Sequence, residues 1–568
     1  MAATFLFLVG CVHSSMVMNS PNPFVAAPDK NHIVHARNGI VVSVSSPASE
    51  VGASVLKKGG NAVDAAVATA FALAVAYPPA GNLGGGGFMM VHPAPGRGEP
   101  VCFDYRECAP AAAYATMYTP KESQFSRRAV AVPGTVRGFA LAHKKYGKLP
   151  WAQLLSPAIA LAKQGFILDT NLAESMNITL ALAPDFEEFQ KVFAKPGGGK
   201  WQVGDRLVQP DLAQTLQLLA DKGPDVFYTG VIAREIIEEM KRGDGIITRE
   251  DLESYRALER KPLTLRYRGL YDVFVPPPPS AGGTCLLEEL SMLENFDLSK
   301  WGKGSAKTIH VMAESMRRAN YDRARYLGDP AFVPGVPELT TLDHGRKLAN
   351  SISMEKATRS EELSTEIKIS HEGDSTTQFS IIDREGMAVA NTYTLERRWG
   401  SRIVVKNRGF LLNNDMRAFN IFPGKTFTNG TIGTASNIIA PGKRPLSSQT
   451  PTIVSVRGKV KIVTGSPGSQ SIPHTVLCIL VSLIDFHTPV EEAVSSPRFS
   501  HQWFPDQITM EATEKQQETV EELKRMGHTM VRMEPVAQGD AHTIWVDEGG
   551  EATGVADWRI NGKAAAIK

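Results

Sequence analysis

Apolar and polar residues alternate in two neighbouring stretches where the last third of the chain begins. The alternation starts at Phe379, breaks at Glu385-Gly386 and resumes through Thr394. Because successive side chains of a strand point to opposite faces, this period of two predicts two β-strands. The Glu-Gly pair between them favours a tight turn, so the two stretches should form a hairpin.

Two threonines, Thr376 and Thr377, open the first of these strands. Taken alone, the pair indicates only a strand, because β-branched residues suit a pleated surface. Its meaning depends on the rest of the chain.

Hydrophobic periodicity elsewhere predicts a helix-rich first part and a strand-rich last third. Helices are expected at residues 46–58, 62–76, 136–146, 151–164, 209–219, 232–242, 306–326 and 471–486. Strands are expected at residues 39–44, 101–106, 403–405, 452–456, 460–464 and 543–546. At 568 residues the chain is long for one ordinary domain, but it is compatible with a single large unit of helices and strands.

Four consecutive glycines occupy positions 84–87. A phosphate-binding loop is one interpretation, but no Gly-Lys-Ser/Thr follows and the Rossmann glycine spacing is absent. We therefore expect these glycines to allow close backbone packing beside a site.

Residues 1–17 are apolar, and no Lys or Arg precedes Lys30. Residues 1–30 are expected to be either a secretory signal segment without its basic start or a disordered N-terminus. Leu8-Val9-Gly10-Cys11 is similar to a bacterial lipoprotein box, which predicts a lipid anchor at Cys11 and an exported protein of the periplasm or cell envelope. The apolar run at 65–77 is too short to cross a bilayer.

The composition narrows the functional classes. The net charge of +2 argues against a nucleic-acid partner, which usually requires a basic surface. The five cysteines show no CxxC spacing and the thirteen histidines no HExxH motif. The sequence therefore predicts no metal site and no cofactor.

Ten short motifs occur in the same order as in one enzyme family. They are residues 61–66 (NAVDAA), 81–89 (GNLGGGGFM), 104–107 (DYRE), 132–135 (VPGT), 146–151 (YGKLPW), 376–377 (TT), 392–395 (TYTL), 412–414 (LNN), 445–448 (PLSS) and 465–468 (GSPG). Together they make the chain resemble the γ-glutamyltranspeptidase (glutathione hydrolase) family of N-terminal-nucleophile hydrolases. Each motif is weak alone, but ten in order are specific.

The resemblance implies an α+β fold, the αββα sandwich of the N-terminal-nucleophile hydrolases. It also implies an inactive precursor that cuts itself between Ser375 and Thr376. The large subunit would span residues 31–375 and the small subunit residues 376–568, and the two would stay together as a heterodimer. A threonine hydroxyl is a poor nucleophile without a base. Cleavage supplies that base, because a freed α-amine has a pKa of about 7.7–8.0.

The resemblance assigns the catalytic roles. Thr376 would be the nucleophile, and the Thr394 hydroxyl would support it. The backbone N–H groups of Gly468 and Ser469 would form the oxyanion hole, each donor worth about 3 kcal/mol. The family often has glycine where this chain has Ser469, so the hole depends on the backbone keeping its shape.

The resemblance also assigns a substrate grip. Arg106, Ser447 and Ser448 match the residues that hold the α-carboxylate of a γ-glutamyl group, and a guanidinium with two hydroxyls suits a carboxylate. The alternative for Arg106 is a surface salt bridge with Glu107 or Asp104.

The chain departs from the family pattern around the substrate ammonium group. Glu396 stands where Asn is usual, Asp415 where Gln or Glu is expected, and Ala418, beside Arg417, where Asp is usual. The loss of that Asp removes a partner of the ammonium group, although Glu396 and Asp415 could supply negative charge. Gln378 also replaces the His that often follows the two threonines.

Three functions follow for testing. The first is cleavage of the γ-glutamyl amide of glutathione or a related compound through a γ-glutamyl-enzyme, with transfer to water, an amino acid or a peptide. The second is a family relative acting on another acyl group: a dicarboxylate monoamide, a glutaryl side chain or poly-γ-glutamate. The third is an uncleaved, non-catalytic scaffold, against which the retention of Thr376, Thr394 and Gly468 argues.

Overall fold

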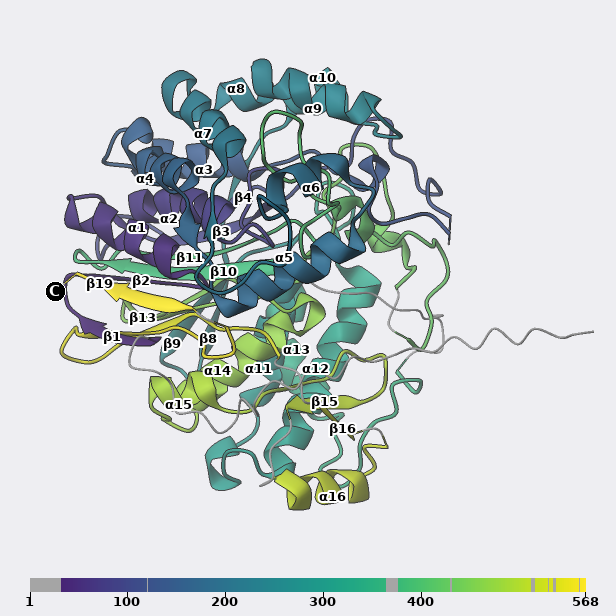
Figure 1. Cartoon of the computed structure of the whole chain (residues 1–568). Coiled ribbons are helices and arrows are strands. Elements are labelled where there is room, and N and C mark those ends of the chain that lie inside the picture. The colour runs from purple at the N-terminus through teal and green to yellow at the C-terminus, as the bar shows by residue number, and fades with distance from the viewer. Residues whose placement is uncertain are drawn as a thin grey trace, which may run out of the picture.

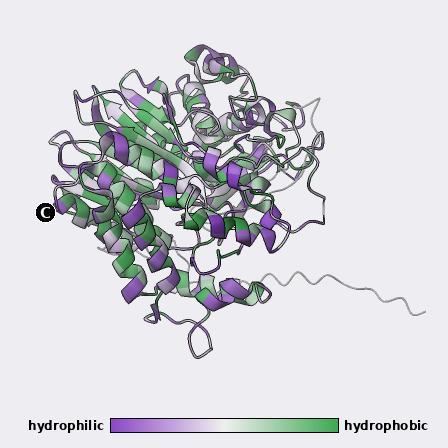
Figure 2. Ribbon diagram, turned by 90° about the horizontal axis from the view of Figure 1, so that it is seen from above, coloured by the Kyte–Doolittle hydropathy of each residue, from purple (hydrophilic) through white to green (hydrophobic). Residues whose placement is uncertain are grey.

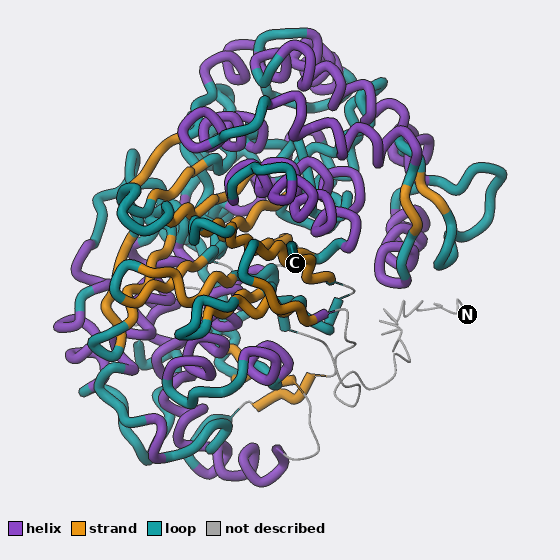
Figure 3. The backbone as a smooth tube through the Cα atoms, turned by 90° about the vertical axis from the view of Figure 1, so that its left-hand side faces the viewer, coloured by secondary structure: helices purple, strands orange, loops and turns teal. Residues whose placement is uncertain are grey.

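Two seven-stranded sheets lie face to face in the middle of the molecule, with helices on both outer sides (Figure 1). The computed structural model describes residues 32–119, 121–363, 376–429, 432–511, 516–529, 531–534, 538–560 and 562–567. Seen from the side, the strands form a band between two groups of helices (Figure 3). The α+β class and the αββα layering expected from the sequence are confirmed.

The first sheet carries the two threonines and has the order β19-β2-β10-β11-β3-β4-β7. Its strands are β19 (Lys563–Ala566), β2 (Gly39–Ser43), β10 (Thr376–Asp383), β11 (Ala388–Thr394), β3 (Gly86–His92), β4 (Val101–Asp104) and β7 (Leu258–Arg260). The hairpin β10–β11 lies between β2 and β3, which come from the start of the chain. The parts before and after Thr376 therefore complete each other within one sheet.

The second sheet has the order β1-β18-β17-β13-β12-β9-β8. Its strands are β1 (Ile33–Ala36), β18 (Ala552–Val555), β17 (Thr543–Val546), β13 (Lys459–Thr464), β12 (Thr452–Val456), β9 (Tyr271–Val275) and β8 (Leu263–Tyr267). It too combines strands from both parts of the chain.

Three apolar layers hold the sandwich together. Buried side chains that include Phe88, Met90 and Val463 fill the space between the sheets. Helices α1 (Ser46–Lys57) and α2 (Ala62–Ala76) pack on the first sheet, and α11 (Ala281–Leu293), α12 (Ala306–Tyr326) and α14 (Ile472–Ile484) pack on the second. Figure 2 shows hydrophobic residues concentrated along the strands and hydrophilic ones on many outer helices and loops. Burial of such apolar area is the main favourable term in folding.

Helix α2 shows how the sequence sets one of these layers. Asn61 accepts a hydrogen bond from the Asp64 backbone N–H at 2.9 Å, and the Asp64 carboxylate accepts one from the Asn61 N–H at 3.0 Å. This capping box fixes the helix start. All residues of the helix are buried, as its apolar sequence on every face predicts.

The other helices surround this core. They are α3 (Thr135–Tyr146), α4 (Trp151–Gln164), α5 (Thr170–Leu182), α6 (Glu187–Phe193), α7 (Pro210–Lys222), α8 (Asp225–Tyr228), α9 (Val231–Lys241), α10 (Arg249–Ser254), α13 (Leu342–Ala349), α15 (Val490–Ser495) and α16 (Gln517–Arg525). Every helix expected from the sequence is present within three residues of its predicted ends. In the part of the chain that the structure describes, no helix has the length and apolar character needed to cross a membrane.

One predicted strand is wrong. Residues 403–405 form no strand but a loop that folds back on itself, with a single bridge between Val404 and Leu411. Arg402 and Asn407 on either side have φ values of 61° and 62°. These left-handed residues turn the chain before a strand can extend. The segment is apolar because it is buried, and burial alone does not distinguish a strand from a loop.

Candidate active site

Thr376 is the first residue of β10 and pairs directly with Thr394, the last residue of β11. The Thr376 hydroxyl donates to the Thr394 hydroxyl, with the two Oγ1 atoms 3.3 Å apart. Thr376 is half-buried, whereas its neighbour Thr377 is 1% exposed on the opposite face of the strand. The pleat therefore presents only one of the two threonines at the open end of the hairpin. Ser375 lies outside the described residues.

Thr394 is held from several sides. Its Oγ1 accepts a hydrogen bond from the Glu396 N–H at 2.8 Å, and its carbonyl accepts one from Asn82 Nδ2 at 2.9 Å. A Cβ atom at Gly85 would lie 1.9 Å from the same carbonyl oxygen. No side chain larger than hydrogen fits there, so the glycine run packs against the strand that supports Thr376. This confirms the prediction of close backbone packing.

The loop after β13 carries Gly468 and Ser469. Gly468 has a φ of 130°, and Ser469 has a φ of 53° in the left-handed region. That conformation costs an L-residue about 1–2 kcal/mol, whereas glycine adopts it freely. Ser469 thus keeps the backbone shape that a glycine would take, at the expense of strain. Strain of this kind is concentrated at functional sites.

This geometry predicts opposite results at the two positions. In Ser469→Gly the relief of strain is offset by the greater unfolded-state entropy of glycine, so stability should change by less than about 1 kcal/mol, with activity retained. In Gly468→Ala the new Cβ would lie 3.0 Å from Ser471 Oγ at a φ that alanine avoids. If this loop forms the oxyanion hole that the family resemblance implies, displacing one of its donors should lower kcat about 100-fold. Equal kcat in the two variants would contradict the assignment of this loop.

Arg106 lies in a buried charge cluster and not on the surface. Its side chain is 1% exposed, and Nη1 lies 2.8 Å from Glu107 Oε2 and 2.6 Å from Asp415 Oδ1. Nη2 lies 4.0 Å from Glu396 Oε2. The pairing with Glu107 therefore exists, but the alternative of a surface salt bridge is wrong, because both partners are buried. Glu396 and Asp415, two of the residues that depart from the family pattern, face the same guanidinium.

The protonation of this cluster follows from its burial. Burial raises the pKa of Asp415 well above its usual value, against the opposing charge of Arg106, and also raises the pKa of Glu107. Burial opposes the charge on Arg106, but Asp415 and Glu107 outweigh it and raise the pKa of the guanidinium. Arg106 thus stays charged, and the two carboxyl groups hold a proton more readily than carboxyl groups in water.

The segment 445–448 packs directly on Arg106. Arg106 Nε donates to the Pro445 carbonyl at 3.3 Å, and Nη2 donates to the Leu446 carbonyl at 3.5 Å. Ser447 is anchored through its backbone, since its carbonyl accepts from the Ala281 N–H at 2.7 Å at the start of α11. Ser448 Oγ accepts from Arg323 Nη2 at 3.5 Å. The structure thus brings Arg106 and both serines into one region.

Ala418 lines a small cavity of about 20 Å³ beside this region. Arg323, Asn437, Leu446 and Gln470 also line it, so the cavity lies between the segment that precedes Ser447 and the loop after Gly468. The volume is enough for one water molecule. Where an aspartate would add negative charge, this chain has a methyl group next to an arginine. Arg417 stacks its guanidinium 5.0 Å from the ring centre of Tyr118.

Gln378 lies away from these groups. It is fully buried, donates to the Phe379 carbonyl at 2.9 Å and accepts from the Thr392 hydroxyl. A Cβ at Gly465 would lie 2.5 Å from its amide, so it packs between the two sheets. The Gln378 side chain therefore contacts both sheets and helps to hold them together.

Three residues of this region were not predicted from the sequence. Asn82 holds the Thr394 carbonyl, Arg323 contacts Ser448, and Gln470 lines the cavity with Ala418. Asn82 lies within the glycine motif, which is a usable signal. Arg323 lies in an ordinary amphipathic helix, and nothing in its local sequence distinguishes it.

Comparisons with known proteins agree with this geometry. The family model described as Gamma-glutamyltranspeptidase matches residues 48–567. A "Glutathione hydrolase proenzyme" of Escherichia coli (strain K12) is 42% identical over 549 residues, covering 95% of this chain and 93% of the relative. An "Acylase ACY 1 proenzyme" of Pseudomonas sp. (strain SE83) is 34% identical, covering 97% and 98%. The crystal structure of a cephalosporin acylase from Bacillus halodurans superposes with a TM-score of 0.84 at 26% identity, covering 95% and 98%.

Proposed function

Because the chain belongs to the gamma-glutamyltranspeptidase family, we propose that Thr376 is its nucleophile and that glutathione or a related γ-glutamyl compound is its substrate. The chain is an autoprocessing hydrolase or transferase of the glutathione hydrolase type. The observation that carries the residue assignment is the Thr376–Thr394 hydroxyl pair, joined through Glu396 to the Arg106 cluster.

The first half of the reaction forms an ester. The α-amine freed by cleavage before Thr376 takes the hydroxyl proton, and Oγ1 attacks the γ-carbonyl carbon. The N–H groups of Gly468 and Ser469 stabilise the resulting oxyanion. When the C–N bond breaks, the leaving amine takes the proton, and the γ-glutamyl group remains on Thr376.

The second half resolves that ester. Water, or the amine of an amino acid or peptide, attacks the same carbonyl carbon while the α-amine accepts its proton. The C–O bond to Thr376 breaks, and the hydroxyl recovers the proton. The Thr394 hydroxyl orients Thr376 Oγ1 throughout.

The two ends of the buried Arg106 guanidinium differ in their contacts. Nη1 is engaged by Glu107 and Asp415, whereas Nη2 has longer contacts within the described part of the chain, at 3.5 Å to Leu446 and 4.0 Å to Glu396. An α-carboxylate at Nη2 would gain a short charge-assisted bond. Ser447 and Ser448 would add hydroxyl donors, and Glu396, 20% exposed, would face the ammonium group.

A second candidate keeps the same chemistry on another acyl group, such as a glutaryl side chain, a dicarboxylate monoamide or poly-γ-glutamate. Ala418 supports it, because it stands where the family usually has an Asp, and the residues that line its cavity include Arg323 and no carboxylate. The 34% identity to a proenzyme called an acylase is compatible with such a change.

The two candidates are separated by two chromogenic substrates, γ-glutamyl-p-nitroanilide and glutaryl-p-nitroanilide, which differ only in the ammonium group. We expect the processed enzyme to hydrolyse the γ-glutamyl compound with the higher kcat/KM. Faster hydrolysis of the glutaryl compound would establish the second candidate, and hydrolysis of neither would contradict both.

Ala418→Asp should raise the preference for the γ-glutamyl over the glutaryl substrate about 10-fold. A carboxylate in this cavity would attract the ammonium group that only the γ-glutamyl substrate has. Ala418→Asn is the matched control, of equal size without charge, and should leave the ratio within about 2-fold. A ratio that moves equally in both variants would show that shape, and not charge, sets the preference.

We further propose that residues up to 375 and from 376 form two subunits that stay associated, supported by their interleaved strands in both sheets. Two relatives are named proenzymes, which is consistent with such processing. Export to the periplasm or cell envelope, with a lipid at Cys11, rests on the apolar start of the sequence, which lies outside the described residues. Fractionation of cells expressing Cys11→Ala tests the lipid directly.

A further inference from the structure

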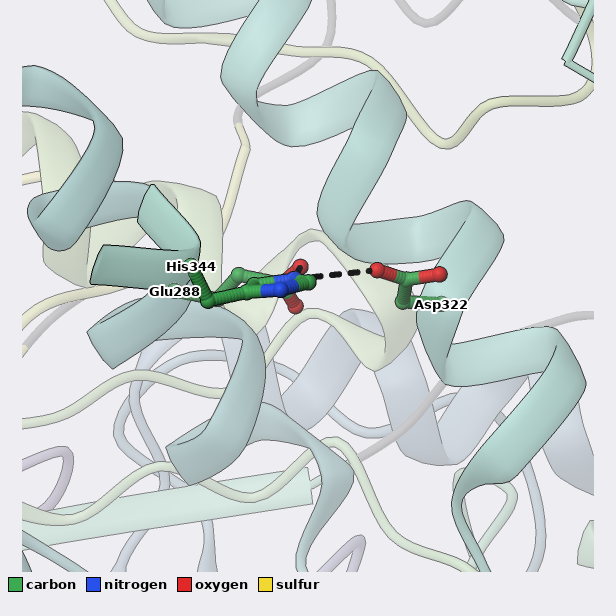
Figure 4. Close-up of side chains that lie close together, drawn as sticks. All are labelled: Glu288, Asp322 and His344. Carbon is green, nitrogen blue, oxygen red and sulfur yellow. Dashed lines mark hydrogen bonds and ion pairs between the residues drawn. The ribbon is translucent and has the colours of Figure 1, made fainter. Parts of the chain in front are cut away.

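Three potential metal ligands meet on helices behind the substrate-grip residues. Glu288 comes from α11, Asp322 from α12 and His344 from α13. Figure 4 shows the imidazole of His344 beside the Glu288 carboxylate, with the Asp322 carboxylate facing them from the neighbouring helix. One potential ligand atom from each residue lies within 4.8 Å of the other two.

The distances suit a small tetrahedral ion. His344 Nε2 lies 3.3 Å from Glu288 Oε1 and 3.5 Å from Asp322 Oδ2. Zinc bonds of about 2.0–2.2 Å to nitrogen and oxygen give a tetrahedron with edges of roughly 3.4 Å. An ion seated between these atoms would need little rearrangement of the side chains.

The charges in the cluster are incompletely balanced by the protein. Glu288 is fully buried, and its Oε2 atom has no hydrogen-bond partner among the residues that the structure describes. Asp322 is 6% exposed, and its other cationic neighbour is Arg325, whose Nη1 lies 3.9 Å from Oδ1. Two buried carboxylates beside a single imidazole require a proton, on the imidazole or on one of the carboxyl groups, or a cation in place of that proton.

The alternative to a metal is a protonated histidine. Hydrogen bonds to Asp322 and Glu288 raise the pKa of His344 to about 9. Imidazolium would satisfy Glu288 Oε1 and Asp322 Oδ2. Burial and the charge of Asp322 also raise the pKa of Glu288, so a proton on Glu288 can bond to Asp322. A divalent ion can approach both Glu288 oxygens and matches the charge of the two carboxylates.

We propose that Glu288, Asp322 and His344 form a Zn²⁺ site, with water as the fourth ligand on the side of His344, whose side chain is 20% exposed. The imidazole favours Zn²⁺ over Mg²⁺ and Ca²⁺, which prefer oxygen ligands. The ion would tie α11, α12 and α13 together.

The ion would also brace the substrate region. α11 begins at Ala281, whose N–H holds the Ser447 carbonyl, and Asp322 immediately precedes Arg323, which contacts Ser448. Fixing α11 to α12 therefore fixes the two elements that position the serines. This effect on substrate binding rests on the proposed function, whereas metal binding and stability do not.

The test uses untagged full-length protein that has been treated with EDTA and then titrated with Zn²⁺ by calorimetry. We expect about one equivalent to bind and the melting temperature to rise. Glu288→Gln and His344→Gln should each weaken binding at least 100-fold, because each loses a direct ligand. His35→Gln removes an exposed histidine on β1 and should bind as the wild type does.

The outcomes are distinct. No binding by the wild type would overturn the proposal and leave a protonated imidazole only. Unchanged affinity in Glu288→Gln and His344→Gln would place the ion elsewhere, and binding of Ca²⁺ or Mg²⁺ but not Zn²⁺ would overturn the choice of metal. The titration and the melting curve of the wild-type protein test the proposal by themselves. The proposal therefore stays open to contradiction even if a variant fails to fold. Inactivity towards γ-glutamyl-p-nitroanilide with zinc bound would count against the proposed function alone.

Discussion

Thr376→Ala is expected to leave the chain as one uncut polypeptide and to reduce γ-glutamyl hydrolysis to background. The variant lacks the hydroxyl that attacks the preceding carbonyl, so no α-amine is freed, and it lacks the nucleophile for the substrate as well. Because the Thr376 hydroxyl is needed for both self-cleavage and substrate attack, its loss should lower kcat at least about 10⁴-fold. The measurements are a denaturing gel and the release of p-nitroaniline.

Thr377→Val is the matched control for this experiment. Thr377 is adjacent, of the same type and 1% exposed, and its Oγ1 has no hydrogen-bond partner in the described parts of the chain. Valine has nearly the same shape, so cleavage and turnover should persist. Thr376→Ser retains a hydroxyl and should still be cut, at a reduced rate. If Thr376→Ala were processed normally, or if Thr377→Val were not processed, the assignment of Thr376 as the nucleophile would be wrong.

Arg106→Gln should have the second largest effect. It removes the guanidinium that we propose binds the substrate carboxylate, and kcat/KM for the γ-glutamyl substrate should fall about 10²–10³-fold through the loss of a charge-assisted hydrogen bond. It also leaves Glu107 and Asp415 buried without their cation, at a cost of about 3–5 kcal/mol where both remain charged. The raised pKa of both carboxyl groups reduces that cost, because they can take up protons.

A second variant separates binding from folding. Arg106→Gln combined with Asp415→Asn removes one unpaired carboxyl group, so the melting temperature should recover while kcat/KM stays low. Arg97→Gln is the surface control, because Arg97 pairs with Glu385 at 2.7 Å but is 64% exposed, and it should change neither quantity. Recovery of kcat/KM in the double variant would show that Arg106 is structural only.

Most of the fold could be predicted from periodicity because its central elements are regular. The bounds of α2, α4, α12, β12 and β17 agree with the predicted ranges to the residue. The hairpin is confirmed, with Gly386 at a φ of 84° in its turn. Residues 403–405 failed because a buried loop and a buried strand have the same apolar composition. Short edge strands such as β1 and β19 gave too few residues for a periodic signal.

The candidate site was accessible only through the motifs. Spacing alone does not place Arg106 beside Asp415, since residues so far apart in the sequence meet only after the sheets assemble. The same reason hides Arg323 and the cluster of Glu288, Asp322 and His344, whose members lie on three helices. From the sequence we could infer only that the backbone at Ser469 must keep the shape that glycine usually gives it. The structure shows that Ser469 adopts this shape with a left-handed φ of 53°.

Whether Thr376 becomes an N-terminus is tested most directly by the intact mass of the purified wild-type protein under denaturing conditions, with N-terminal sequencing of the smaller fragment. We expect two chains, the smaller spanning residues 376–568 and beginning Thr-Thr-Gln-Phe. A single intact chain, or a smaller chain beginning at any other residue, would contradict this expectation.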